Sequence, residues 1–276
     1  MALVAFAGNS LICRLALAEQ TIDATSFTVL RIISGAAMLS TLVLFSRLKT
    51  RRALSKSTPQ GSWAGAIALF LYATAFSYAY IELNTGMGAL ILFSSVQITM
   101  ILVSIVKGSR LSSLEWLGFI IAMSGFVYLV LPGINAPSIL GSVLMILSGV
   151  AWGIYSLIGA KSTDALADTS ANFRRASVLS LILLPVLVIN ASFSIEGALY
   201  AALSGAVTSG LGYAIWYRVL PQLRANVAAV SQLSVPVLAT LGGWLVLSET
   251  LSLSFMIASG VIISGIAMVI FARSAS

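Results

Sequence analysis

The sequence contains no histidine and only one cysteine, Cys13. Without histidine the chain has no histidine general acid or base, no histidine metal ligand and no histidine proton relay. A single cysteine also excludes a disulfide within the chain. We therefore expect no catalytic residues, no metal site and no cofactor.

Charge is also scarce in this sequence. Only 8% of the residues are charged, 59% are apolar, and the mean hydropathy is +1.04. Such values lie outside the range of soluble domains and predict a polytopic membrane protein embedded in a lipid bilayer. The apolar runs last about 18 to 22 residues, which suits transmembrane helices, whereas barrel strands alternate over about ten residues. The expected fold class is therefore all-α.

Acidic residues are missing from the middle of the apolar runs. Every one lies in a loop or at the end of a run, including Glu115 and Glu249. A proton-coupled exporter of cationic drugs needs a deep carboxylate that holds proton and drug in turn. This absence argues against a multidrug antiporter and favours a carrier that runs its substrate downhill. A membrane enzyme is disfavoured for a similar reason, because it needs deep aspartates, a Ser/His pair or a catalytic histidine.

The apolar runs predict ten transmembrane helices. By residue number they are 2–18, 25–46, 62–81, 86–106, 113–131, 138–159, 172–190, 197–216, 226–247 and 253–272. The first run ends in Ala16-Leu17-Ala18, which is similar to a signal-peptidase site. We interpret it as a span, because it lacks a basic start and carries Asn9, Ser10 and Arg14.

Basic residues gather in every second loop. Thirteen of the 15 follow this alternation: Arg47, Lys49, Arg51, Arg52, Lys56, Lys107, Arg110, Lys161, Arg174, Arg175, Arg218, Arg224 and Arg273. The positive-inside rule then predicts that both termini are cytoplasmic. It also explains the net charge of +7 without a nucleic acid partner, because the cations form no basic face.

The two halves of the chain resemble each other weakly. A shift of 140 positions aligns residues 226–271 with 86–131 without a gap, and a shift of 144 pairs Arg31 with Arg175. Each half, 1–131 and 138–276, holds five predicted spans, and an odd number means that the second half enters the membrane from the opposite side. We therefore predict two inverted five-helix repeats in one integrated membrane domain.

Several short motifs accompany this pattern. The halves open on Ala7-Gly8-Asn9-Ser10 and Ala151-Trp152-Gly153, have an arginine in the second span, and end on Ser124-Gly125 and Ser264-Gly265. Together these features resemble the drug/metabolite transporter superfamily, EamA type. Ala7 replaces the tryptophan usual there and Arg14 a lysine, which is similar to aromatic amino acid exporters of the YddG kind. The resemblance implies a central cavity between the third, fourth, eighth and ninth spans, helped by the first and sixth.

Amides and aromatic rings are the candidate substrate-binding residues. Asn9, Gln97 and Gln232 either hydrogen-bond between helices or bind the amino or carboxylate group of a solute. The aromatic candidates are Tyr72, Phe76, Tyr80, Trp152, Tyr155, Tyr213 and Trp216. They offer a pocket for an apolar side chain and cation–π attraction for an ammonium group. An interfacial aromatic belt is the alternative for Tyr80, Trp216 and the neighbouring Tyr217.

Arg14 and Arg31 are the only basic residues that lie within spans toward the outer side. Each either binds a substrate carboxylate or extends outward toward Glu19 or Asp23.

The candidate hinges for a rocking motion are Gly86, Gly88, Pro236, Gly242 and Gly243. Close helix packing is the alternative role for them.

These features predict a monomeric carrier in the inner (plasma) membrane of a bacterium, which exports small metabolites by alternating access. We expect amino acids with large or aromatic side chains as the small-molecule substrate, moved downhill. A nucleotide sugar or a lipid-linked sugar is the alternative cargo of the same fold. An anionic nucleotide sugar requires several cations in the cavity, however, and this chain offers at most two, Arg14 and Arg31.

Overall fold

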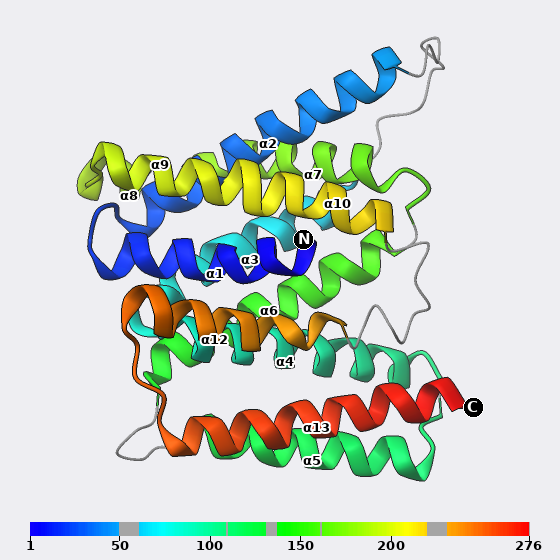
Figure 1. The fold of residues 1–276 in the computed structure, drawn as a ribbon. Helices are drawn as coiled ribbons and strands as arrows, with labels where there is room; N and C mark the ends of the chain where they lie inside the picture. The colour runs from blue at the N-terminus through cyan, green and yellow to red at the C-terminus, as the bar shows by residue number, and fades with distance from the viewer. Residues whose placement is uncertain (50–60, 109, 131–136, 161, 220–230, 276) are drawn as a thin grey trace.

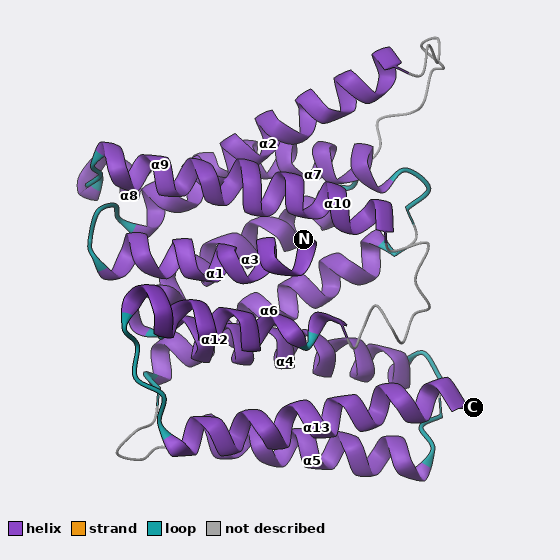
Figure 2. Ribbon diagram, in the orientation of Figure 1, coloured by secondary structure: helices purple, strands orange, loops and turns teal. Residues whose placement is uncertain are grey.

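The computed structural model describes the chain except for residues 50–60, 109, 131–136, 161, 220–230 and 276. Throughout the described part the regular structure is helical (Figure 2), and Ile22 and Phe193 form an isolated antiparallel β-bridge. The α-helices are α1 (Ala2–Ala18), α2 (Ala24–Lys49), α3 (Trp63–Glu82), α4 (Thr85–Val106), α5 (Ser113–Val130), α6 (Ile139–Gly159), α7 (Ala165–Leu179), α8 (Leu184–Asn190), α9 (Ile195–Leu203), α10 (Gly212–Val219), α12 (Ser234–Leu247) and α13 (Leu253–Ala275). Two further segments are the 3-10 helix η1 (Ser180–Leu183) and the π-helix η2 (Ser204–Leu211).

Eight helices of the described part are long and apolar enough to cross a membrane. Two of them are composite, Ala165–Ile189 from α7, η1 and α8, and Ile195–Trp216 from α9, η2 and α10. The shorter α1 and α12, with 17 and 14 residues, are apolar too. The protein is therefore a helical, polytopic membrane protein. Predicted span 2–18 coincides with α1, while predicted span 226–247 begins outside the described residues, so the count of ten spans stays a prediction.

The seventh span begins earlier than the sequence prediction of residue 172. The Asp164 side chain caps α7 by accepting a hydrogen bond from the amide of Ala167, at 3.1 Å. This cap satisfies one of the amides that every helix start leaves free. An apolar-length criterion missed the start of α7 because the polar residues Asp168, Thr169 and Ser170 interrupt the apolar run there.

Three helices begin with the same pattern of serine followed three residues later by glycine. The pairs are Ser62 with Gly65, Ser138 with Gly141 and Ser194 with Gly197, and in each the serine side chain accepts from the glycine amide. The glycine also lies in close contact with a neighbouring segment of the chain. A Cβ at Gly197 would lie 2.4 Å from the carbonyl oxygen of Thr21. This pattern thus caps a helix and packs it in one step.

Asp23 joins two loops at one end of the bundle. Its carboxylate accepts from the amides of Thr25 and Ser26 at the start of α2, and from the amide of Ser192 at 3.0 Å. Partial burial opposes ionisation of this carboxyl, but the hydrogen bonds from Ser26, Ser192 and Thr25 outweigh it and lower its pKa. The charged form is therefore part of the folded structure.

The helices form one bundle, in which α1 begins and α13 ends at the same end (Figure 1). Along one edge α5 and α13 lie side by side (Figure 1). A Cβ at Gly265 would lie 2.4 Å from the amide nitrogen of Ala122, and one at Gly118 would lie 2.7 Å from the Gly265 carbonyl oxygen. Glycine at these positions lets the two helices approach closely. These are the last predicted spans of the two halves, and they are packed against each other.

Candidate functional site

A cavity of about 500 Å³ lies inside the bundle. Side chains of α1, α3, α4, α6, α7, η2 and α10 line it, together with Gln232 just before α12. The predicted substrate-binding residues that line it are Asn9, Tyr72, Phe76, Gln97, Trp152, Tyr213, Trp216 and Gln232. The structure thus brings together residues that lie far apart in the sequence. Their contact with a substrate stays a prediction.

Two other predicted substrate-binding residues, Tyr80 and Tyr155, are buried beside this cavity without lining it. The Tyr80 ring packs against Phe76, with centroids 4.8 Å apart, and the Tyr155 ring stacks on Trp152 at 5.3 Å. In this conformation both support lining residues from behind. The side chain of Tyr217 lies outside the described part.

One wall of the cavity is a continuous set of aromatic rings. Trp152 lies 5.0 Å from Tyr213 with an interplanar angle of 26°, and 4.8 Å from Tyr72 with an angle of 43°. Phe76 continues the wall beyond Tyr72, at 5.5 Å. Such pairs stabilise one another and bury their faces, because ring quadrupoles favour stacked and tilted contacts. The wall is therefore a firm surface for a planar or large apolar group.

The amides of the cavity have different surroundings. The Asn9 side-chain oxygen accepts hydrogen bonds from the hydroxyls of Ser204, at 2.6 Å, and Thr208, at 3.1 Å. Asn9 therefore joins α1 to η2, which is the helix-to-helix alternative. Gln97 and Gln232 have no hydrogen-bond partner among the described residues, although both line the cavity. Their donors and acceptors are available to a solute.

The π-helix η2 supplies the polar side of the cavity. It places Thr208 and Ser209 on the cavity surface. Gly205 in the same segment meets α2, because a Cβ there would lie 2.1 Å from the carbonyl oxygen of Arg31. Sequence analysis missed these two hydroxyls. Their signal is the run of small and polar residues, 204–210, inside an otherwise apolar span.

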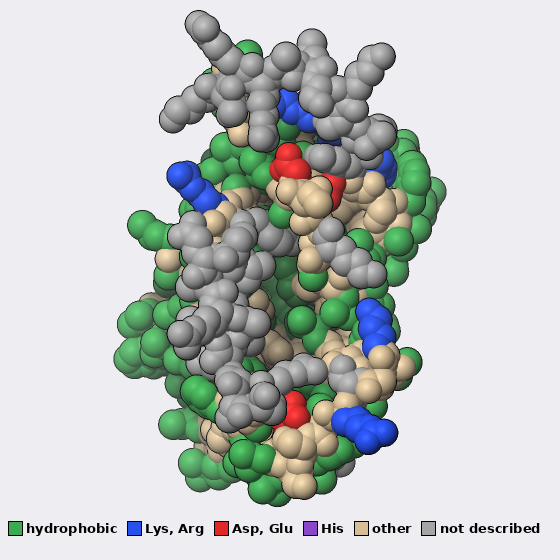
Figure 3. Space-filling view, turned by 90° about the vertical axis from the view of Figure 1, so that its right-hand side faces the viewer, with side chains coloured by type: hydrophobic (Ala, Val, Ile, Leu, Met, Phe, Trp, Pro, Cys, Tyr) green, Lys and Arg blue, Asp and Glu red, His purple; other side chains and the backbone are tan. Residues whose placement is uncertain are grey.

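The cavity reaches the end of the bundle at which α13 ends. Gly159 and Ala160 at the end of α6, with Ser162 and Ala165 after them, are among its lining residues. Figure 3 looks onto this end and shows its surface hollowed near the middle.

A polar cluster lies at the other end of the bundle. Arg14 donates to the carbonyl oxygens of Tyr80, at 2.9 Å, and Ile81, at 2.8 Å, and its Nε lies 3.5 Å from the Glu249 carboxylate. Glu249 also accepts from the amide of Thr85 at 2.9 Å. The expected partners of Arg14, Glu19 or Asp23, were wrong. The reason is that Glu249 is far away in sequence but adjacent in the fold, which no local pattern reveals.

Arg31 remains inside the bundle, with an exposed fraction of 2%. One guanidinium nitrogen donates to the Tyr72 hydroxyl at 2.8 Å, and the group lies over the rings of Phe76, at 4.7 Å, and Tyr72, at 5.1 Å. Its Nη1 is buried without a hydrogen-bond partner among the described residues. Arg31 therefore does not extend outward toward Glu19 or Asp23.

The glycines proposed as hinges are sites of close contact. A Cβ at Gly86, Gly88 and Gly243 would lie 2.3, 2.5 and 2.2 Å from the side chains of Thr240, Tyr80 and Glu249, respectively. Gly242 is less tight, because a Cβ there would lie 3.3 Å from Leu11. The packing role is thus visible at these positions, and the hinge role stays a prediction.

Pro236 lies in the first turn of α12, where a missing amide proton leaves no helix hydrogen bond unmade. Proline cannot donate to the carbonyl of Gln232, the residue four positions earlier, so the helix does not continue unbroken through this point. Accordingly Leu233 is a turn and α12 begins at Ser234. This break places Gln232 beside the cavity, and a hinge here stays a prediction.

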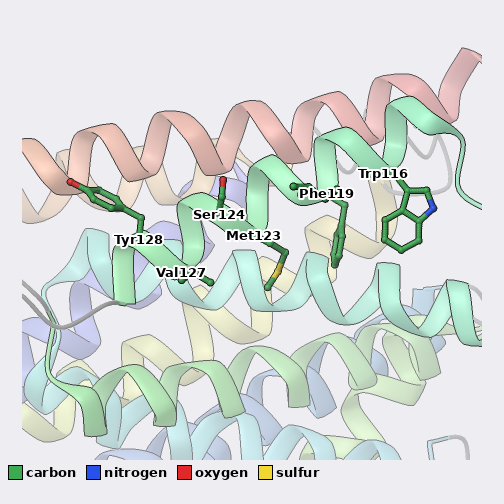
Figure 4. Close-up of a pocket in the computed structure, with 7 residues that line it drawn as sticks. Trp116, Phe119, Met123, Ser124, Val127 and Tyr128 are labelled. Carbon is green, nitrogen blue, oxygen red and sulfur yellow. The ribbon is translucent and has the colours of Figure 1, made fainter.

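A second hollow, of about 460 Å³, lies on the outer side of α5 (Figure 4). Its lining comes from α5 alone and is apolar apart from Ser124; Trp116 and Tyr128 there are 44% and 50% exposed. In a membrane protein such a face meets lipid. It is not a candidate site.

Carboxylates are confined to the edges of the bundle. All eight acidic residues are described, and they lie in loops or in the first or last turn of a helix. Among the described residues, the lining of the cavity includes no charged side chain. In the described part no group of three His, Cys, Asp or Glu residues is placed to hold a metal ion.

Comparisons with known proteins agree with this architecture. Residues 139–271 match the model of the EamA-like transporter family. The chain is 48% identical over 276 residues to an uncharacterized protein of Pseudomonas aeruginosa, which covers 99% of this chain and 93% of that protein. It is 27% identical over 241 residues to an uncharacterized transporter of Archaeoglobus fulgidus, with 86% of each covered.

The uncharacterized transporter YoaV of Bacillus subtilis is 20% identical over 257 residues, covering 90% of this chain and 87% of that protein. A protein crystal structure superposes with a TM-score of 0.64 over 99% of this chain and 98% of that one, at 19% identity. This likeness shows a shared fold.

Proposed function

We propose that this membrane transporter, whose residues 139–271 match the EamA-like transporter family, exports amino acids with large or aromatic side chains. Transport occurs by alternating access and downhill, without proton coupling. The proposal includes ten spans in two inverted repeats, 1–131 and 138–276, with cytoplasmic termini. It also includes a monomer in the inner membrane of a bacterium.

The aromatic wall beside unpartnered amides carries this proposal. Stacked rings at Tyr72, Trp152 and Tyr213 match a large apolar or aromatic side chain, while Gln97 and Gln232 offer both donors and acceptors. A volume of about 500 Å³ lies within the range of about 300–1,000 Å³ typical of small-molecule sites. A single amino acid fits such a space.

Alternating access is supported by the asymmetry of the two ends. The cavity reaches the end where Ser162 and Ala165 lie, whereas Arg14, Glu249 and Thr85 close the opposite end. With cytoplasmic termini, this conformation is open toward the cytoplasm. An exporter loads its substrate in such a state.

The uniport mechanism is supported by the position of the carboxylates. A proton antiporter needs an acidic group that the substrate and the proton occupy in turn. The described lining of the cavity has none. The same lining has no Lys or Arg to compensate a diphosphate, so a nucleotide sugar gains no support.

The test is uptake of labelled phenylalanine by proteoliposomes that contain the purified full chain, with alanine as the comparator and with or without a pH gradient. We expect saturable phenylalanine uptake that stops at equal concentrations on the two sides, whatever the gradient. Accumulation driven by the gradient would overturn the uniport mechanism. Absence of phenylalanine flux would overturn the amino acid substrate.

A pair of tryptophan variants sharpens this test. Trp152→Leu removes the central ring of the wall and should raise the KM for phenylalanine about three- to tenfold, since an aromatic pair contributes about 0.5–1.5 kcal/mol. Trp116→Leu, on the outer face of α5, is the matched control and should leave the KM unchanged. Equal effects of the two variants would contradict the proposed site.

A further inference from the structure

Arg31 is a buried cation without a carboxylate to balance it. No carboxylate among the described residues pairs with Arg31, and every acidic residue lies at an edge of the bundle. A buried charge without a partner costs several kcal/mol, even after local relaxation. Ring contacts with Phe76 and Tyr72 offset part of this cost. The remaining positive potential favours an anion nearby.

Tyr72 connects this cation to the cavity. Arg31 lies on α2, which contributes no lining residue, whereas Tyr72 lines the cavity and its hydroxyl accepts from Arg31 at 2.8 Å. A guanidinium has donors only, so the Tyr72 oxygen is the acceptor and the phenolic proton remains to be donated. When a hydroxyl oxygen accepts a hydrogen bond from a cation, the hydroxyl group becomes a stronger hydrogen-bond donor.

Tyr213 is the neighbouring phenol, because its side chain interacts with that of Tyr72. A neutral phenol is a weaker acceptor than a carboxylate, since charge-assisted hydrogen bonds are about twice as strong as neutral ones. An anionic solute in the cavity would therefore be a better acceptor than Tyr213 for the hydrogen bond that the Tyr72 hydroxyl donates. Its negative charge would also compensate Arg31.

We propose that the cavity holds its solute by a carboxylate, which accepts a hydrogen bond from the Tyr72 hydroxyl. Arg31 is a positioning residue behind Tyr72 that supplies the compensating charge. This assignment rests on the proposed function, because it takes the cavity as the transport site. It predicts a preference for carboxylates with a large apolar group over amines with the same group.

Two probes that both have a phenyl ring, but carry opposite charges, test this preference. One is 3-phenylpropanoate, which has a carboxylate only, and the other is 2-phenylethylamine, which has an ammonium only. Binding to the purified full chain is measured by the concentration dependence of its thermal stabilisation. We expect 3-phenylpropanoate to bind about tenfold more tightly, as one hydrogen bond to a charged group allows. Equal affinities, a preference for the amine, or binding of neither probe would overturn the assignment.

Variants of two tyrosines on α3 then locate the contact. Tyr72→Phe should weaken 3-phenylpropanoate about tenfold and leave 2-phenylethylamine unchanged. Tyr78→Phe is the matched control, because the Tyr78 hydroxyl also bonds to α2, at Thr25 and 2.6 Å, but does not line the cavity. It should change neither affinity. A Tyr72→Phe protein that keeps the preference would overturn the assignment.

A variant pair at Arg31 tests the role of charge separately from packing. Arg31→Lys keeps a cation and should keep the preference for the carboxylate probe, while Arg31→Met should abolish it. Loss of the preference in both, or in neither, contradicts the positioning role. If a variant does not fold, the comparison of the two probes on the unmodified chain still decides.

Phenylalanine uptake distinguishes the two proposals. Binding of 3-phenylpropanoate without phenylalanine transport would overturn the amino acid substrate and leave the carboxylate site intact. Phenylalanine transport without a carboxylate preference would overturn the carboxylate site alone.

Discussion

At the scale of single residues, polar atoms inside the bundle matter because the hydrocarbon around it offers no hydrogen bonds. Asn9 is the clearest case. Its side-chain oxygen accepts from two hydroxyls, those of Ser204 and Thr208. The Asn9 amide therefore holds α1 against η2, and it also lines the cavity.

Replacing this amide tests the structural half of its role. Asn9→Ala leaves the buried hydroxyl of Ser204 without its acceptor, while Thr208 keeps the Ser204 carbonyl oxygen, so we expect the unfolding free energy in detergent to fall by about 1 kcal/mol. Ser124→Ala, which removes a hydroxyl on the exposed side of α5, is the control and should change it little. Thermal unfolding measures both, and equal midpoints would contradict the expectation.

At the scale of elements, the hydrogen bonds that the Asp23 carboxylate accepts at the start of α2 make the stability of the fold depend on pH. Asp23 holds α2 and Ser192 together, and the hydrogen bonds it accepts lower its pKa. A carboxyl with a lowered folded-state pKa stabilises the fold above its unfolded pKa of about 3.9, and loses this contribution as pH falls through the folded value. The stabilisation is thus complete at neutral pH.

Asp23→Asn should therefore lower the thermal midpoint at pH 7, because an amide keeps only one of the two carboxylate acceptors. The difference from the unmodified chain should shrink as pH falls below about 4. Thermal unfolding at several pH values checks this. A constant difference at all pH values would mean that the ionised form is not the source of the stabilisation.

The contact between α5 and α13 depends on glycine. Gly265→Ala places a methyl group 2.4 Å from the backbone of Ala122, so we expect a loss of about 1–3 kcal/mol from overpacking. Gly260→Ala in the same helix meets nothing within 4 Å and is the control. Its midpoint should stay equal or rise slightly, since alanine favours helix. Equal losses in both variants would contradict close packing at Gly265.

Helical spans were predictable from local pattern, because each is an apolar run whose length matches the bilayer. The same pattern failed at the start of α7, where a polar capped turn precedes the apolar run. Eight of the ten predicted substrate-binding residues line the cavity, since amides and aromatic rings are conspicuous inside spans. Thr208 and Ser209 were missed because hydroxyls are common in helices. The partner of Arg14 was missed because it depends on long-range packing.

At the scale of the whole molecule, the two ends of the bundle have opposite states. Arg14, Glu249 and Thr85 close one end, and Ser162 lies at the open one. In a carrier that alternates, the closed end has to release these contacts when the open end closes. We therefore expect the cluster around Glu249 to stabilise the present state.

Glu249→Gln should weaken this cluster and shift the population away from the present state. The readout is the rate at which a membrane-impermeant maleimide labels Ser162→Cys in a Cys13→Ser background, and we expect it to fall. Glu196→Gln, at an exposed carboxylate that bonds Tyr200 on its own helix, is the control. An unchanged labelling rate in Glu249→Gln would exclude the cluster as a gate.

The ion pair of Arg14 with Glu249 also bears on how the protein is made. Arg14 leaves the ribosome with the first helix, whereas Glu249 is synthesised only when the last helix is about to follow. During translation the first helix therefore waits in the membrane with its cation unmatched. The ion pair is therefore completed only after nearly all of the other helices have been synthesised.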